Sequence, residues 1–194
     1  MKIQHFFDPT TFTLTYVVYD EASCDAVIID PVLDYDPQAC TTSTVSAERV
    51  VNFVKDTGLH VHYILETHAH ADHLSGAHLL RQEYFKDVKI AIGSQIKAVQ
   101  STFKDVFNFG DWFKPDGSQF DRLLHDDETV SAGSLKFKVI FTPGHTPACA
   151  SYLFEDHLFC GDSIFMPDFG TGRCDFPAGS ASDLYDSIKN NIYT

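Results

Sequence analysis

The chain has 194 residues, of which 14 are Lys or Arg, 27 are Asp or Glu and 10 are His, so its formal net charge is −13. A pI near 4.9 and the lack of a Lys/Arg-rich run argue against nucleic acid or an anionic membrane as a partner. No apolar run approaches the roughly 20 residues that span a bilayer, and no signal peptide is expected. Five irregularly spaced cysteines are typical of a reduced, cytoplasmic chain, and the length fits one domain over residues 1–194.

The first third of the chain predicts strands, a loop and a helix. Runs of β-branched and aromatic residues over 13–19 and 26–30 are typical of strands. The polar stretch 34–44 is expected to be a loop. A helix with an apolar face is expected to begin near Ser46 and to end at Gly58.

The remaining elements alternate in the same way. We expect strands over 60–66, 88–92, 129–130, 135–141, 151–154 and 158–160, helices over 74–84, 95–103 and 180–192, and loops over 107–121 and 142–147. Ser180 or Ser182 is the expected N-cap of the last helix. The mixture favours an α/β fold with much antiparallel pairing, a layered sandwich rather than a doubly wound sheet.

Metal-binding side chains gather directly after the strand 60–66. His68, His70, Asp72 and His73 lie within six residues. Because residues i and i+2 of an extended segment face the same side, His68 and His70 are expected to point together. Asp72 and His73 lie where the chain turns toward a helix and can face the same pocket. A solvated surface cluster is the alternative, but this density at the end of a buried strand favours a metal site.

Two distant residues extend this set. His145 lies in a tight Pro-Gly-His-Thr-Pro loop, and Asp162 follows a strand in Cys-Gly-Asp-Ser. Taken alone, each of the two residues is interpreted equally well as a turn residue or as a metal ligand. Together with the first cluster they favour a ligand set of imidazoles and carboxylates, which suits Zn²⁺, Fe²⁺ or Mn²⁺.

These segments resemble the metallo-β-lactamase superfamily. The resemblance rests on the motif HxHxDH over 68–73, followed in order by Gly144-His145 and Gly161-Asp162. It implies a four-layer αββα sandwich with the metal site at one edge of the two sheets. The segments 67–76, 142–149 and 172–176 resemble the persulfide dioxygenases. The segments 165–168 and 172–177 more closely resemble the bacterial branch called β-lactamase-hydrolase-like.

The resemblance implies two alternative ligand sets. In persulfide dioxygenases one Fe²⁺ is held by two His and one Asp, which match His68, His145 and Asp162. In the dinuclear hydrolases His68, His70 and His145 match the ligands of one zinc. There Asp72, His73 and a later His match the second zinc's ligands, with Asp162 bridging. No residue here matches that later His, so we expect a chain that lacks the final strand and helix of the fold, and a mononuclear site.

The leading functional hypothesis is oxidation of glutathione persulfide, or a related small persulfide, by O₂ at Fe(II). His70, Asp72 and His73 would then act catalytically around the metal by orienting ligands or water. Arg173 could bind a substrate carboxylate, although an ordinary salt bridge explains it equally well. The alternative is a zinc-dependent hydrolase of a thioester or other acyl substrate, similar to glyoxalase II. A second alternative is an inactive, truncated metal-binding module. The resemblance also implies a homodimer.

Overall fold

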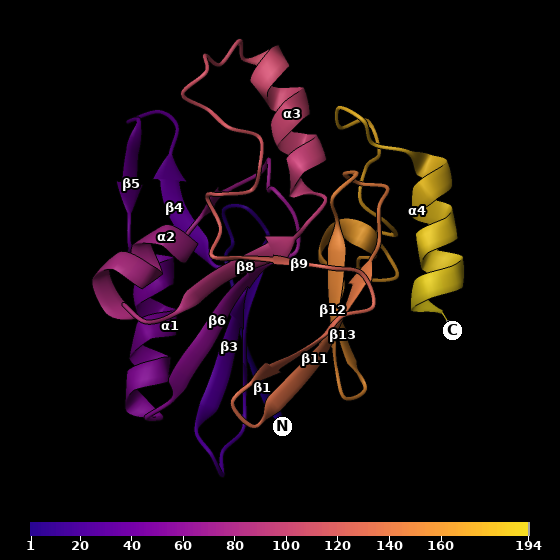
Figure 1. Cartoon of the computed structure of the whole chain (residues 1–194). Coiled ribbons are helices and arrows are strands. Elements are labelled where there is room, and N and C mark those ends of the chain that lie inside the picture. The colour runs from indigo at the N-terminus through magenta and orange to yellow at the C-terminus, as the bar shows by residue number, and fades with distance from the viewer. Residues whose placement is uncertain (194) are drawn as a thin grey trace. The chain divides into compact units, whose positions relative to one another are not determined.

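A computed structural model describes residues 1–193 of the chain, so Thr194 of the expected domain lies outside the described residues (Figure 1). Its internal contacts group into two compact units. The first unit comprises Met1–Glu66, His70–Ala91 and Ser131–Lys136. The second comprises Thr67–Ala69, Ile92–Val130 and the chain from Phe137 onward.

The first unit is built on a mixed sheet. Its strands lie in the order β1 (Lys2–Phe7), β2 (Leu14–Tyr19), β3 (Asp25–Ile29), β6 (His60–Glu66) and β8 (Lys89–Gly93), the last of which crosses into the second unit. β1, β2 and β3 pair antiparallel, whereas β3 and β6 pair parallel. The parallel pair needs a crossover, which contains helix α1 (Val45–Asp56). α1 buries one apolar face through Ala47, Val50, Val51 and Val54, as its spacing predicts.

The parallel pairing of β3 and β6 brings two acidic residues together. Both strands end at the same edge of the sheet, where the Asp30 amide donates a hydrogen bond to the Leu65 carbonyl at 2.9 Å. Asp30 follows β3, and Glu66 is the last residue of β6. His70 lies four residues beyond Glu66, so a histidine of the metal-binding motif starts from the same edge.

Two predictions for this unit were wrong. The stretch 34–44 contains strand β4 (Val32–Asp36) and strand β5 (Thr41–Ser43), which form a hairpin rather than an irregular loop. The helix expected from residue 74 is preceded by β7 (Leu74–Ser75), which pairs with β4, and begins as α2 (Ala77–Leu79). It continues as η1 (Leu80–Tyr84). Strand β1 had no counterpart among the predicted elements.

The second unit contains an antiparallel sheet. β10 (Thr129–Ala132), β11 (Leu135–Phe141), β12 (Ala150–Phe154) and β13 (His157–Phe159) lie in sequence order, although the turn Ser131–Lys136 belongs to the first unit. Phe137, Val139, Tyr152 and Phe154 are fully buried on one side of it. These strands confirm the predicted pattern over 129–160.

Helices and short turns complete the second unit. They are α3 (Ile96–Val106), η2 (Gly161–Ser163), α4 (Ala181–Ser187) and η3 (Ile188–Ile192), together with strand β9 (Arg122–Leu124). Ser180 is the N-cap of α4, since its hydroxyl accepts a hydrogen bond from the Asp183 amide at 3.2 Å. Ile92, Ile96, Val99, Ala148 and Phe176 form one buried cluster, which packs α3 against the loops around residues 148 and 176.

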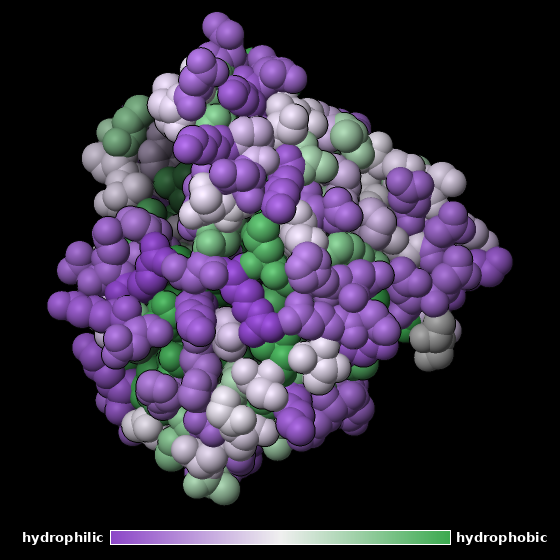
Figure 2. Space-filling view, viewed as in Figure 1, coloured by the Kyte–Doolittle hydropathy of each residue, from purple (hydrophilic) through white to green (hydrophobic). Residues whose placement is uncertain are grey.

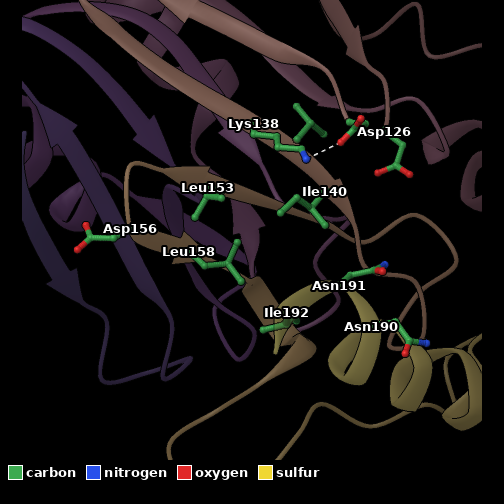
Figure 3. A pocket seen from close by; sticks show the side chains of 11 residues that line it. Asp126, Lys138, Ile140, Leu153, Asp156, Leu158, Asn190, Asn191 and Ile192 are labelled. Atoms are coloured by element: carbon green, nitrogen blue, oxygen red, sulfur yellow. Dashed lines mark ion pairs between the residues drawn. The ribbon is translucent and has the colours of Figure 1, made fainter. Parts of the chain in front are cut away.

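The surface of the described residues includes polar areas and a groove in the second unit. Figure 2 shows a face covered mainly by hydrophilic residues with small hydrophobic areas, as the composition suggests. A groove of about 700 Å³ in the second unit is lined by apolar side chains of β11, β12 and η3, and by Lys138, whose ammonium pairs with Asp127 at 2.5 Å (Figure 3). No histidine or cysteine lines it. Within residues 1–193, no helix combines the length and apolar character that crossing a bilayer requires.

Candidate metal centre

His68, His145 and Asp162 come together in the second unit, as the sequence predicts. Their potential ligand atoms all lie within 4.8 Å of one another. The Nε2 atoms of His68 and His145 lie 4.0 and 3.5 Å from the same Oδ2 atom of Asp162. The two imidazole rings meet edge to face with centroids 5.0 Å apart. Both histidines are buried, whereas Asp162 is half-buried.

The local chain conformation fixes His68. Its Nδ1 lies 2.9 Å from the hydroxyl oxygen of Thr67, and the carbonyl of Thr67 accepts a hydrogen bond from the Ala150 amide at 2.9 Å. Gly161 lies against this pair in a left-handed conformation with φ of +49°. A Cβ atom at Gly161 would lie 2.5 Å from the Thr67 hydroxyl oxygen, so the close approach requires glycine.

His145 is fixed through its other ring nitrogen. Its Nδ1 lies 2.7 Å from the backbone carbonyl oxygen of Arg173. Because a carbonyl only accepts hydrogen bonds, Nδ1 must carry the proton, and a neutral ring then has its lone pair on Nε2. The preceding Gly144 has φ of +147° and packs directly against Leu184 of α4. This loop geometry directs Nε2 of His145 toward Asp162.

The donor chemistry of this triad fits a transition-metal ion. Two imidazole Nε2 atoms face one carboxylate oxygen, and both Nδ1 atoms have hydrogen-bonding groups that hold the rings. Such outer contacts fix the tautomer and raise the basicity of a ligating histidine. Two His and one carboxylate form the donor set typical of non-haem Fe(II) enzymes, and it also suits zinc.

His70, Asp72 and His73 form a separate group in the first unit. Their potential ligand atoms also lie within 4.8 Å, and the two imidazole rings are 4.2 Å apart. His73 donates from Nδ1 to the Leu74 carbonyl at 3.0 Å, which leaves its lone pair on Nε2. That Nε2 atom is buried and has no hydrogen-bond partner among the described residues. A buried acceptor of this kind fits a metal ion. Asp72 is exposed and accepts a hydrogen bond from the Thr13 hydroxyl at 3.2 Å.

This second group opens into a cavity of the first unit. The cavity has a volume of about 830 Å³, and His70, Asp72 and His73 line it together with side chains of the β4–β5 hairpin. Tyr35 and Leu74, both partly exposed, contribute apolar surface to its lining. The volume lies in the range of small-molecule sites.

Sequence reasoning missed two carboxylates behind His70. Its Nε2 donates to Asp30 Oδ1 at 3.1 Å and lies 3.3 Å from Glu66 Oε2. Burial raises the pKa of Glu66, and the neighbouring charge of Asp30 adds to the rise. Burial alone would lower the pKa of His70, but the Asp30 and Glu66 carboxylates hold it well above its ordinary value. The sequence signal that could have indicated them is an acidic residue at the end of each of two apolar strands, Asp30 after β3 and Glu66 at the end of β6.

Arg173 contributes its backbone, rather than its side chain, to the triad. The guanidinium is exposed, with its Nε 3.4 Å from Asp175 Oδ1. Its expected contact with a substrate carboxylate therefore stays a prediction. Phe176, three residues further on, packs near His145 with ring centroids 6.0 Å apart.

Comparison with known proteins identifies relatives across nearly the whole chain. The family model described as metallo-beta-lactamase superfamily matches residues 9–193. A probable metallo-hydrolase of Burkholderia pseudomallei is 46% identical over 97% of this chain and 67% of its own length. Glyoxylase B2 of Dictyostelium discoideum is 49% identical over 97% of this chain and 64% of its own length.

The chain is also similar to persulfide dioxygenases, both in sequence and in structure. The human mitochondrial persulfide dioxygenase ETHE1 is 31% identical over 99% of this chain and 63% of its own length. The crystal structure of ETHE1 from Myxococcus xanthus matches with a TM-score of 0.78 and 30% identity, over 100% of this chain and 70% of that one. The chain spans between 63 and 67% of the length of these three curated relatives. These matches confirm the expected fold.

Proposed function

The chain belongs to the metallo-β-lactamase superfamily, a superfamily of metalloenzymes, and from this premise we propose that it is a persulfide dioxygenase. The proposed substrate is a small persulfide such as glutathione persulfide, which is oxidised by O₂. His68, His145 and Asp162 would hold one Fe(II), which when bound supplies redox chemistry that zinc cannot.

One observation carries this proposal. The triad has a complete two-His, one-carboxylate donor set, and both imidazoles are oriented by contacts at Nδ1. Three protein donors form a full set for a mononuclear site of this class. The similarity to persulfide dioxygenases over 99% of the chain supports the same activity.

The surrounding residues have separate proposed tasks. The Arg173 carbonyl holds His145 in the tautomer that presents Nε2, and the Thr67 hydroxyl orients the ring of His68 through its Nδ1 atom. Phe176 shields one side of His145 from water. The exposed Arg173 guanidinium would exchange its contact with Asp175 for a carboxylate of the substrate.

The direct test combines metal analysis with O₂ uptake. Protein purified without added metal should contain about one iron per chain, and it should consume O₂ with glutathione persulfide but not with glutathione. The Asp162→Asn variant should lose iron and O₂ uptake together, because it removes the carboxylate of the donor set. Zinc-loaded protein that cleaves a glutathione thioester without consuming O₂ would contradict the proposal.

A second candidate function is zinc-dependent hydrolysis of a thioester or other acyl substrate. The buried Nε2 atom of His73, beside His70 and Asp72, favours it because this group offers donors for a further metal ion. The relatives named metallo-hydrolase and glyoxylase B2 point the same way. Asp72 would then orient the attacking water. Two zinc ions per chain with thioester cleavage would select this candidate, and metal binding without turnover on either substrate would select the inactive module.

A further inference from the structure

The exposed side of the triad lies at Asp162. The side chains of His68 and His145 are 1% and 6% exposed, whereas that of Asp162 is 34% exposed. A molecule that arrives from solvent therefore reaches the triad past Asp162. The segment next to this carboxylate is thus placed to select among arriving molecules, although the proposed chemistry gives most of it no task.

The chain leaves Asp162 and returns to it through one short loop, residues 164–171, which we call the apolar loop. The Gly172 amide donates a hydrogen bond to the Asp162 carbonyl at 3.1 Å. A Cβ atom at Gly172 would collide with that carbonyl oxygen, so this close return requires glycine. At the other end Ser163 is buried, and its hydroxyl donates to the Thr142 hydroxyl at 3.2 Å. Both ends of the apolar loop are therefore fixed beside a proposed metal ligand.

The apolar loop holds its shape through its own backbone. The Phe165 amide donates to the Gly170 carbonyl at 2.8 Å. The amides of Phe169 and Gly170 both donate to the Met166 carbonyl, at 2.8 and 3.1 Å. Because these bonds close the turn, the loop does not need large apolar side chains to keep its conformation.

Three side chains of the apolar loop are nevertheless large, apolar and exposed to solvent. Phe165, Met166 and Phe169 are 41%, 70% and 77% exposed. A single exposed apolar residue is ordinary, but these three lie within five residues of sequence, beside the accessible carboxylate of Asp162. Concentrated apolar surface of this kind marks a binding site. Since the loop begins and ends at Asp162, the molecule it is placed to bind is the one that approaches the triad.

A cation adjoins the apolar loop. Arg173 follows Gly172, and its exposed guanidinium has Asp175 as its neighbour at 3.4 Å. Apolar surface next to a guanidinium complements an aliphatic chain that ends in a carboxylate. Glutathione matches the loop poorly, because its amide groups need hydrogen-bonding partners. The amides of Phe165, Phe169 and Gly170 are already used within the loop.

We propose that the apolar loop determines substrate specificity and selects persulfides carried on an aliphatic chain that ends in a carboxylate. The chain lies against Phe165, Met166 and Phe169, and its carboxylate pairs with Arg173. The catalytic part of this inference rests on the proposed function, whereas binding of the chain does not. Each methylene group that the loop buries fully favours binding by about fourfold.

Methionine labelling tests the binding directly. The sequence has two methionines, Met1 and Met166, so protein labelled with ¹³C at the methionine methyl groups gives a signal within the loop, assigned with Met166→Leu. The ligands are ω-mercaptooctanoate and ω-mercaptopropionate, which share a thiol and a carboxylate and differ in chain length. The longer thiol should shift the Met166 signal, with or without Zn²⁺, and the shorter should not. No shift in either form, or equal shifts with both thiols, would overturn the inference.

O₂ uptake then measures the selectivity. In the iron-containing wild type, kcat/KM should be about 10–100-fold higher for mercaptooctanoate persulfide than for mercaptopropionate persulfide. Phe169→Ser and Met166→Ser should bring this ratio close to one without changing iron content, since both side chains are exposed. Phe12→Ser is the matched control, because it makes the same change at a side chain that is 78% exposed in the first unit.

Two sets of results separate the inference from the proposed function. A wild-type ratio near one, or the same high ratio in Phe169→Ser, Met166→Ser and the wild type, would overturn the selection by the apolar loop. A Met166 signal that responds to the longer thiol, in protein that consumes O₂ with neither persulfide, would contradict the proposed function and leave binding by the loop intact.

Discussion

Replacing Thr67 by valine tests how the triad is held in place. Valine has almost the same shape but removes the hydroxyl oxygen that lies 2.9 Å from Nδ1 of His68. Both residues are about 1% exposed, so no solvent can replace the lost acceptor. When Nε2 binds a metal, Nδ1 carries the proton, and the variant removes the Thr67 hydroxyl that accepts it.

The expected loss of metal-binding free energy in Thr67→Val follows from two general quantities. Leaving a buried donor unsatisfied costs about 1–3 kcal/mol. Removing an outer contact of a ligating histidine typically weakens metal binding by about 10–100-fold, which corresponds to about 1.4–2.8 kcal/mol. We therefore expect most of the cost of Thr67→Val to appear in the metal-bound protein, because metal-free His68 can move its proton to Nε2, near Asp162.

The assay is a competition of Fe(II) or Zn(II) between the protein and a chelator, with a melting curve of each variant in the metal-free state. Ser151→Ala is the control, since it removes a buried hydroxyl that contacts Thr142 at 2.9 Å in the same unit without contacting the triad. Thr67→Val should lose metal affinity and Ser151→Ala should not. Equal metal affinities in Thr67→Val and the wild type would refute the view that Thr67 fixes His68.

Three further predictions follow from the same structure. Gly161→Ala places a Cβ 2.5 Å from the Thr67 hydroxyl at a positive φ, so calorimetry and metal analysis should show a loss of at least about 1–2 kcal/mol of stability together with lower metal occupancy. Arg173→Ala should raise KM for glutathione persulfide while iron content stays constant, because the guanidinium is exposed and only the backbone touches His145; a loss of iron would contradict this. Hydrogen bonds from His62 and from the Ser134 amide hold the pKa of Asp25 well below its ordinary value of 3.8. The ionised Asp25 therefore contributes to stability above pH 3.8, and this contribution is lost as the pH falls through the lower pKa of the folded state. The difference in unfolding free energy between the wild type and Asp25→Asn, measured with urea, should therefore be largest near pH 7 and shrink under acid conditions, and a pH-independent difference would contradict this assignment.

The sequence indicated the candidate ligands because their signals are local, whereas the grouping of His68 with His145 and Asp162 came from the family resemblance. His68 belongs to a dense motif that follows an apolar strand, and His145 and Asp162 each follow a strand, where a rigid sheet can hold a ligand. The strands and the helix over 45–66 and the strands over 129–160 could also be predicted, because hydrophobic spacing alone specifies them.

The missed features depend on contacts between distant segments. Leu74 and Ser75 form a strand only because Leu33 and Val32 pair with them, and a two-residue strand has no periodicity to detect. The contacts of His70 with Asp30 and Glu66 need the parallel pairing of β3 with β6. This pairing brings together two acidic residues that lie 36 positions apart in the sequence. The contact of the Arg173 carbonyl with His145 was missed because no sequence pattern reports a backbone carbonyl, while the substrate contact expected of the guanidinium stays a prediction.

The most direct test of the central claim is a crystal structure of the protein as purified, with anomalous data collected on both sides of the iron absorption edge. The proposed function predicts one iron peak between Nε2 of His68, Nε2 of His145 and the carboxylate of Asp162. A zinc peak at that position with no iron signal, or no metal at the triad in protein that oxidises persulfide, would contradict it.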